Sequence, residues 1–218
     1  MATASAALLD LAALRRVPVQ EEPYPYLIVP GFLPPTAVAA ISADFPRIEQ
    51  GGSFPIAELN CGPAFRAFVG ELEGAGLRTI MAEKFALDLA GRPTMITVRG
   101  QARAGDGRIH ADARSKLITV LIYMNEDWRE DAGRLRLLRS AADLEDYAAE
   151  VPPSGGALLV FRRSERSWHG HKPTSGPRRA VQLNWVTSQA VVDHEQGRHR
   201  ISTKLKKFRN LFMPSSAA

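Results

Sequence analysis

The chain has 218 residues, 45% of them hydrophobic, and a formal net charge of +5. This length and composition are typical of a single soluble domain with a large core. The only cysteine, Cys61, excludes an intramolecular disulfide and a zinc site made of several thiolates. We therefore expect one domain over residues 1–218, and a reducing cytoplasm is its simplest location.

The positive charge is concentrated near the C-terminal end. Six of the 28 Lys and Arg residues lie from Arg198 onward, where no acid occurs, which leaves 22 basic against 23 acidic residues before that point. Apolar residues recur there at helical spacing, at Ile201, Leu205, Phe208 and Phe212. This pattern predicts a basic amphipathic helix over residues 198–213 that docks by its apolar stripe. A nucleic-acid or membrane adaptor acting through this helix is the alternative, but no recognised binding motif supports it.

The first 92 residues are expected to be mostly helical. Residues 6–14 form an apolar stretch, but Asp10 interrupts it and two arginines follow it, which is the wrong charge order for a secretory signal. A short amphipathic helix fits better, and no later stretch approaches the length of a membrane span. Residues 24–30 predict a short edge strand, and helices are expected over residues 36–44, 64–72 and 77–87. We expect these three helices to pack on one face of the second half of the chain.

The periodicity changes to that of β-strands from Pro93 onward. Short runs rich in β-branched and aromatic residues alternate with turn residues, at residues 95–98, 116–124, 134–138, 157–161 and 179–185. Several strands at such short intervals are typical of a β-sandwich or a jelly-roll barrel. The predicted jelly-roll core spans residues 93–190.

His110 and Asp112 are the first candidate metal ligands. Side chains alternate between faces in an extended segment, so these two point the same way and are able to bind one ion. His169, after the strand at residues 157–161, is a candidate third ligand, and alternation alone does not distinguish it from His171. Two imidazoles and one carboxylate hold ferrous iron while leaving coordination positions open. A His-x-Asp pair also arises often by chance, so the prediction depends on the surrounding sequence.

Arg179 is the candidate anchor for an anionic ligand. Alternation places it on the same face of the final predicted strand as three bulky residues, Val181, Leu183 and Trp185. This apolar face is expected to point inward, which would bury Arg179 and leave Arg178, on the opposite face, as a solvated charge. A buried guanidinium needs an anionic partner, and a carboxylate matches its planar fork.

The candidate residues belong to a longer series of motifs in the second half of the chain. The series consists of His110 with Asp112, residues 117–128, Ala132-Gly133 with the strand after it, residues 153–156 and 158–161, Trp168-His169-Gly170, and residues 176–185. It resembles the prolyl 4-hydroxylase-like branch of the Fe(II)- and 2-oxoglutarate-dependent dioxygenases. The resemblance covers residues 95–185, and residues 24–46 are similar to the family's usual N-terminal opening. The chain departs from the family at Ala132, where a glycine is usual, and in the tail after Trp185, which has no counterpart.

The resemblance implies a mainly β fold with flanking helices, a double-stranded β-helix or jelly-roll with helices packed on one sheet. It implies Fe(II) bound by His110, Asp112 and His169, with 2-oxoglutarate as co-substrate and O2 as oxidant. Arg179 would bind the distal carboxylate of 2-oxoglutarate. Tyr123 matches a position that often contacts the same carboxylate, and a tyrosine packed in the strand core is the alternative. The implied activity is hydroxylation of an unactivated C–H bond, with release of succinate and CO2.

These motifs leave the substrate and the oligomeric state open. The resemblance suggests a peptidyl prolyl residue, and a small molecule fits equally well. Basic residues flank the candidate ligands, at Arg99, Arg103, Arg108, Arg114, Lys116, Arg162, Arg163 and Arg166. They favour an anionic substrate through electrostatic steering, and solvated loop residues without a role are the alternative. A non-catalytic cupin-like metal-binding protein is a second reading, which the predicted carboxylate anchor disfavours.

Overall fold

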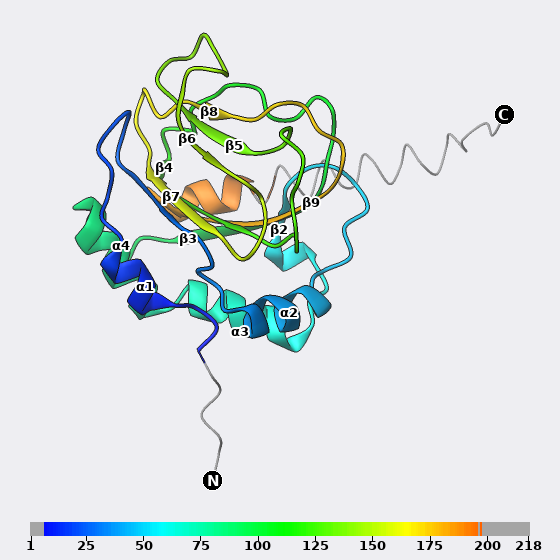
Figure 1. Cartoon of the computed structure of the whole chain (residues 1–218). Helices are drawn as coiled ribbons and strands as arrows, with labels where there is room; N and C mark the ends of the chain where they lie inside the picture. The colour runs from blue at the N-terminus through cyan, green and yellow to red at the C-terminus, as the bar shows by residue number, and fades with distance from the viewer. Residues whose placement is uncertain (1–6, 196, 198–218) are drawn as a thin grey trace, which may run out of the picture.

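Two antiparallel β-sheets form the centre of the molecule, and helices lie beside the larger one (Figure 1). The computed structural model describes residues 7–195 and residue 197. The larger sheet has the strand order β1-β7-β4-β9-β3-β2, and the smaller one has the order β6-β5-β8. This arrangement is the predicted jelly-roll. Its described strands form two separate hydrogen-bonded sheets and not one closed barrel.

Most of the strands coincide with the predicted ones. The larger sheet contains β1 (Tyr26–Val29), β2 (Phe54–Pro55), β3 (Thr94–Ala102), β4 (Lys116–Tyr123), β7 (Leu158–Arg162) and β9 (Gly176–Val186). The smaller sheet contains β5 (Leu135–Leu138), β6 (Tyr147–Val151) and β8 (His169–Gly170). The sequence pattern does not predict β2, β6 and β8, because two of them have only two residues and β6 is half-buried over most of its length.

The helices of the first half are α1 (Leu11–Arg16), α2 (Pro35–Ala43), α3 (Pro63–Leu72) and α4 (Ala75–Phe85), with a 3-10 turn, η1, at Ile56–Glu58. The three predicted helices are confirmed, with small shifts at their ends. Prolines begin α2 and α3, where a missing N–H leaves no hydrogen bond unmade. The N-terminal helix begins later than predicted because Asp10 caps it, accepting a hydrogen bond from the N–H of Ala13 at 2.8 Å.

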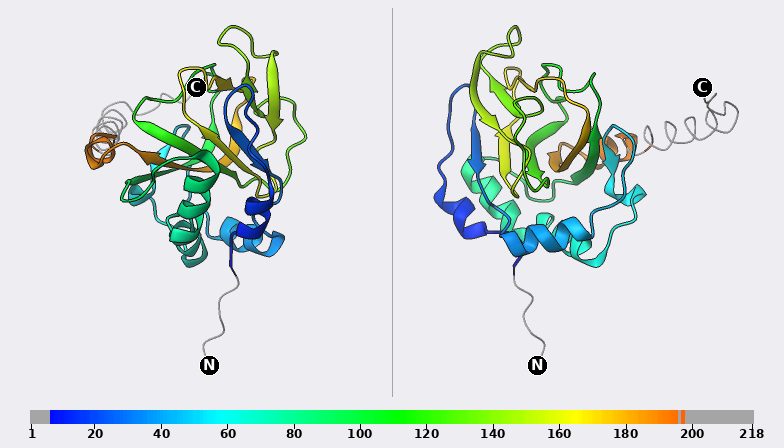
Figure 2. Two further views of the ribbon diagram at one scale, coloured as in Figure 1. Left: turned by 90° about the vertical axis from the view of Figure 1, so that its left-hand side faces the viewer. Right: turned by 45° about the vertical axis from the view of Figure 1, so that its right-hand side comes forward.

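Both faces of the larger sheet are buried. One face packs against the helices (Figure 2), in a core that joins Phe65 and Phe68 of α3 with Val120 and Leu183. The opposite face packs against the smaller sheet through a second cluster, which includes Phe161. Because β4 and β9 lie in the middle of the larger sheet, polar residues on their inner face are enclosed between the two sheets. The candidate site is built there.

The C-terminal part of the described chain is helical over residues 189–195. The predicted basic amphipathic helix over residues 198–213 lies outside the described residues. Within the part of the chain that the structure describes, no helix has both the length and the apolar character needed to cross a membrane.

Candidate metal centre and co-substrate pocket

A backbone bridge brings His110 and His169 together from distant parts of the chain. The N–H of His110 donates to the carbonyl of His169 at 3.0 Å, and the N–H of His169 donates to the carbonyl of His110 at 2.9 Å. His110 precedes β4, and His169 lies in β8, which pairs with β5. The centroids of the two imidazole rings are consequently 4.3 Å apart.

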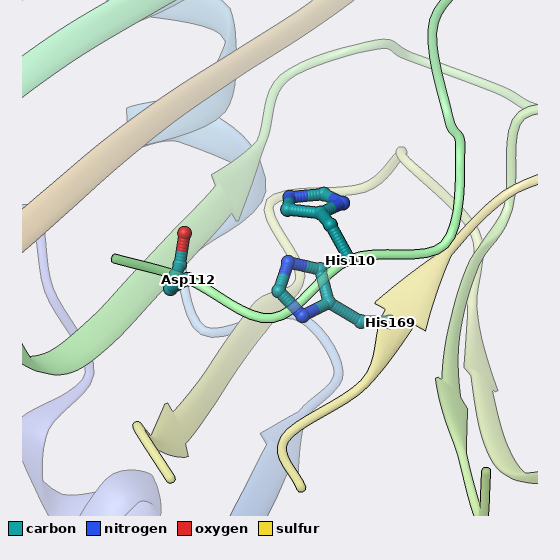
Figure 3. Close-up of side chains that lie close together, drawn as sticks. All are labelled: His110, Asp112 and His169. Carbon is teal, nitrogen blue, oxygen red and sulfur yellow. The ribbon is translucent and has the colours of Figure 1, made fainter. Parts of the chain in front are cut away.

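Asp112 completes a cluster of three potential metal ligands (Figure 3). One ligand atom from each of His110, Asp112 and His169 lies within 4.8 Å of the other two. Asp112 and His169 are buried, whereas His110 is exposed. These are the three residues predicted from the sequence, and the fold brings them together from a loop and from a strand of the smaller sheet.

Backbone carbonyls fix the orientation of both imidazoles. The Nδ1 atoms of His110 and His169 lie 2.9 Å from the carbonyl oxygens of Arg108 and Ser167, which only accept hydrogen bonds. Nδ1 therefore carries the proton in each ring, and the lone pair of Nε2 is free to bind a metal. Burial lowers the pKa of His169 to about 4 and so keeps the imidazole neutral, although Asp112 acts in the opposite direction.

Two side-chain donors hold the Asp112 carboxylate. Lys116 Nζ donates to Oδ1 and Thr119 Oγ1 donates to Oδ2, both at 2.6 Å. Burial raises the pKa of Asp112, but the Lys116 ammonium, the His169 ring and these two hydrogen bonds together bring it below its ordinary value. Asp112 is thus ionised, which is the form that binds a cation.

His171 lies in the same cavity but apart from the cluster of three. Its Nδ1 lies 2.8 Å from the carbonyl oxygen of Lys172, and its backbone N–H donates to the carbonyl of Gly107 at 2.9 Å. Among the described residues, the ligand atoms that approach one another come from His169 and not from His171. The tertiary structure therefore separates two histidines that strand alternation left equivalent.

The structure reverses the predicted burial of Arg178 and Arg179. Arg178 is only 5% exposed and lines the cavity beside the histidines, whereas Arg179 is exposed. The prediction that Arg179 points inward is wrong because the polar face of β9, and not the apolar one, lines the cavity between the sheets. The apolar face, with Val181, Leu183 and Trp185, packs against the helices. The more polar face, with Arg178, points into the space between the sheets.

Arg178 has no ion-pair partner among the described residues. Its Nε donates to the carbonyl of Gly133 at 2.8 Å, its Nη2 has no hydrogen-bond partner, and its guanidinium lies 5.4 Å from the ring centroid of Tyr123. The Tyr123 hydroxyl also lacks a partner, although this side chain is fully buried. Buried polar groups are nearly always hydrogen-bonded, so these two neighbouring donors mark a position for an anionic ligand.

Two adjoining cavities meet at the candidate metal ligands. The inner cavity contains Arg178, Tyr123 and His171 in addition to the cluster of three. The outer cavity extends toward residues 53–57 and 191–195, and its wall includes Lys116. The residues lining both cavities are Ser53, Thr97, Arg99, His110, Asp112 and Gln182. A ligand in either cavity would therefore lie next to a bound metal.

Sequence reasoning missed a row of polar side chains on the inner faces of β4 and β9. Thr119, Asn184 and Gln182 lie there, and Thr119 contacts Asp112 directly. The signal was present in the alternation of β9, where Gln182 and Asn184 share the face of Arg178. Three polar residues on one face of a central strand indicate a polar interior as readily as a solvated surface.

The comparisons with known proteins agree with this geometry. Residues 100–187 match the family model of the 2OG-Fe(II) oxygenase superfamily. A prolyl-4-hydroxylase from Pseudomonas putida is similar with a TM-score of 0.54 and 20% identity, covering 74% of this chain and 92% of that one. A prolyl hydroxylase from Trichoplax adhaerens, in complex with a hypoxia inducible factor peptide fragment, has a TM-score of 0.53 and 19% identity, covering 74% and 83%. HygX from Streptomyces hygroscopicus, with nickel and 2-oxoglutarate bound, has a TM-score of 0.52 and 12% identity, covering 75% and 82%.

No curated protein matches the chain in sequence. At the identities above, the structural matches establish only the fold. The family model is the one comparison that matches the sequence itself, over residues 100–187. The matched segment contains the three candidate metal ligands and Arg178. Residues 100–187 are thus similar in sequence to the 2OG-Fe(II) oxygenase superfamily, and the fold of the chain is similar to that of the solved prolyl hydroxylases, in agreement with the resemblance of its motifs.

Proposed function

We propose that this chain is an Fe(II)- and 2-oxoglutarate-dependent hydroxylase, acting on an unactivated C–H bond of a peptidyl prolyl residue or of a small molecule. The observation that carries the proposal is one cavity shared by the His-Asp-His cluster and a buried arginine that has no acidic partner among the described residues. A cupin-like protein that binds a metal without turnover has no need of the second feature.

His110, Asp112 and His169 would hold the iron. Two imidazoles whose Nε2 atoms are turned away from the backbone carbonyls and one ionised carboxylate match the donor set of non-haem Fe(II) oxygenases. When bound, the iron supplies the activation of dioxygen that couples decarboxylation of 2-oxoglutarate to hydroxylation of a C–H bond. The carbonyls of Arg108 and Ser167 keep both rings turned toward the ion, a role typical of outer-shell groups.

Arg178, and not Arg179, is the proposed anchor of 2-oxoglutarate. Its Nη2 and the Tyr123 hydroxyl are two unpartnered donors in the same cavity, and a single carboxylate accepts from both. With its distal end held there, the co-substrate would extend toward the metal ligands. Leu121, Leu135 and Ala180 line the inner cavity and keep water from the distal carboxylate, which strengthens the ion pair.

The charges of the inner cavity favour joint binding of a metal and a dianion. Arg99 and Arg178 balance Asp106 and Asp112 in its lining, and Arg99 Nη1 pairs with Asp106 at 2.8 Å. A divalent cation alone would add positive charge beside Arg99, Arg178 and Lys116, and a dicarboxylate alone would add negative charge beside Asp106 and Asp112. We therefore expect each of the two to increase the affinity of the other.

An anaerobic titration tests the proposal. Adding Fe(II) and 2-oxoglutarate to the full chain should produce a weak visible charge-transfer band, which Asp112→Ala should abolish. Asp143→Ala, at an exposed carboxylate, is the matched control and should keep the band. Succinate formation would then be followed with prolyl peptides and with small molecules. Absence of both the band and any 2-oxoglutarate-dependent succinate would refute the proposed function.

A further inference from the structure

A chain of hydrogen bonds runs from Asp112 along the inner face of the larger sheet to Gln182. Thr119 Oγ1 donates to Asp112 Oδ2 at 2.6 Å, and Asn184 Nδ2 donates to Thr119 Oγ1 at 2.8 Å. Gln182 Nε2 in turn donates to Asn184 Oδ1 at 2.8 Å. Thr119 and Asn184 are each 1% exposed, so water does not replace these contacts.

The acceptors at one end of this chain fix its direction. An ionised carboxylate only accepts, so the single hydroxyl proton of Thr119 goes to Asp112 and its oxygen must accept from Asn184. The backbone carbonyl of Ile118, 3.4 Å from Asn184 Nδ2, also requires the amide nitrogen on that side. Asn184 therefore turns its Oδ1 toward Gln182, and Gln182 donates a hydrogen bond to it from its NH2 group. A flipped Gln182 would bring two carbonyl oxygens together.

The fixed direction leaves Gln182 with one free polar atom, its carbonyl oxygen. Gln182 makes one side-chain hydrogen bond to a described residue, the one to Asn184. The side chain is half-buried and lines both cavities, at the junction that also contains His110 and Asp112. The amide oxygen is thus a hydrogen-bond acceptor next to the metal ligands, on the side from which a substrate in the outer cavity would approach.

We propose that Gln182 determines substrate specificity by accepting a hydrogen bond from an N–H or O–H group of the substrate. The inference rests on the proposed function and narrows its substrate to a polar small molecule that carries an ammonium, amine or hydroxyl group near the oxidised carbon. Glu73 in the wall of the outer cavity provides further acceptors for such donors. The ring nitrogen of a peptidyl prolyl residue carries no hydrogen and offers Gln182 nothing to accept.

The first test compares matched compounds with the iron-loaded full chain. The panel consists of free amino acids including L-proline, amino sugars and polyols, each paired with its N-acylated or O-methylated counterpart, together with capped prolyl peptides. Substrate-stimulated succinate formation should occur with donor-bearing compounds and fall by about tenfold or more in their blocked counterparts, as expected for one lost hydrogen bond to a charged or buried group. Stimulation by capped prolyl peptides alone, or by no donor-bearing compound, overturns the inference.

The second test measures both members of a compound pair, donor-bearing and blocked, with the wild type and with Gln182→Met, as in a double-mutant cycle. In this variant the KM for the donor-bearing compound should rise by about tenfold while the KM for the co-substrate changes little, and blocking the compound should then have little further effect. Gln189→Met, the same substitution at an exposed position, is the control. Equal effects of Gln182→Met on both members of a pair would show that the side chain acts only on the structure. Failure of the proposed function is recognised separately, because it abolishes binding of Fe(II) and 2-oxoglutarate.

Discussion

Replacing Arg178 by methionine should weaken 2-oxoglutarate binding far more than the same replacement at Arg179. Arg178 is 5% exposed, and its Nη2 lacks a partner in the described structure. Truncating one member of a buried, hydrogen-bonded charge pair costs about 2–5 kcal/mol. With about 1.4 kcal/mol for each factor of ten, the Kd of the co-substrate should rise by about 30-fold at least. Arg178→Lys keeps the positive charge but loses the planar fork, so its Kd for the co-substrate should lie between those of the wild type and Arg178→Met.

Arg178→Met should leave the ligand-free protein almost as stable as the wild type. Methionine loses the hydrogen bond from Nε to Gly133 and the contact with the Tyr123 ring, which together are worth about 2 kcal/mol. It also removes the cost of burying a guanidinium without an acidic partner, which offsets much of this loss. The midpoint of thermal unfolding should therefore change by only a few degrees, since about 1 kcal/mol corresponds to about 2–4 °C at this chain length. If Arg178 had a purely structural role, Arg178→Met would instead lower the midpoint of thermal unfolding strongly.

Calorimetric titration of the manganese-loaded protein with 2-oxoglutarate provides the assay. Thermal unfolding with and without 2-oxoglutarate gives an independent measure, because a ligand that binds the native state raises the midpoint. Arg179→Met is the matched control, since the Arg179 guanidinium lies over the Phe45 ring, 5.2 Å from its centroid, and is exposed. The reasoning is refuted if Arg179→Met weakens 2-oxoglutarate binding and Arg178→Met does not.

Four further substitutions test the remaining parts of the structure. His169→Ala should weaken binding of Mn(II) by about 100-fold or more in calorimetry, whereas His171→Ala should change it by less than about threefold; the reverse order would exchange the two roles. Lys116→Met should increase the affinity for Mn(II) by about threefold to tenfold, because the ammonium no longer competes for Asp112, and a loss of affinity would show instead that Lys116 positions the carboxylate. Phe68→Ala should lower the free energy of unfolding in urea by about 3–5 kcal/mol, since Phe68 is fully buried between helix and sheet, and a change below about 1 kcal/mol would contradict the described core.

The sequence alone predicts the class of fold and two of the three candidate ligands on physical grounds. Strand alternation is a local property of the chain, so the series of short apolar runs identifies the strands, and the spacing of His110 and Asp112 places both on one side of an extended segment. The choice of His169 over His171 came from the family resemblance. Only the bridge between His110 and His169 supplies a geometric reason for it.

The orientation of β9 is what only the tertiary structure decided. Alternation correctly separates Arg178 and Gln182 from Val181 and Leu183, but it does not say which face meets water. Helices cover one side of this sheet and a second sheet covers the other, so neither face of β9 is exposed from Ala180 to Val186, although Arg179 before this part is. The apolar face then belongs to the helix layer and the polar face to the site. That arrangement depends on contacts between residues far apart in the chain, and it determines which arginine lines the cavity beside the candidate metal ligands.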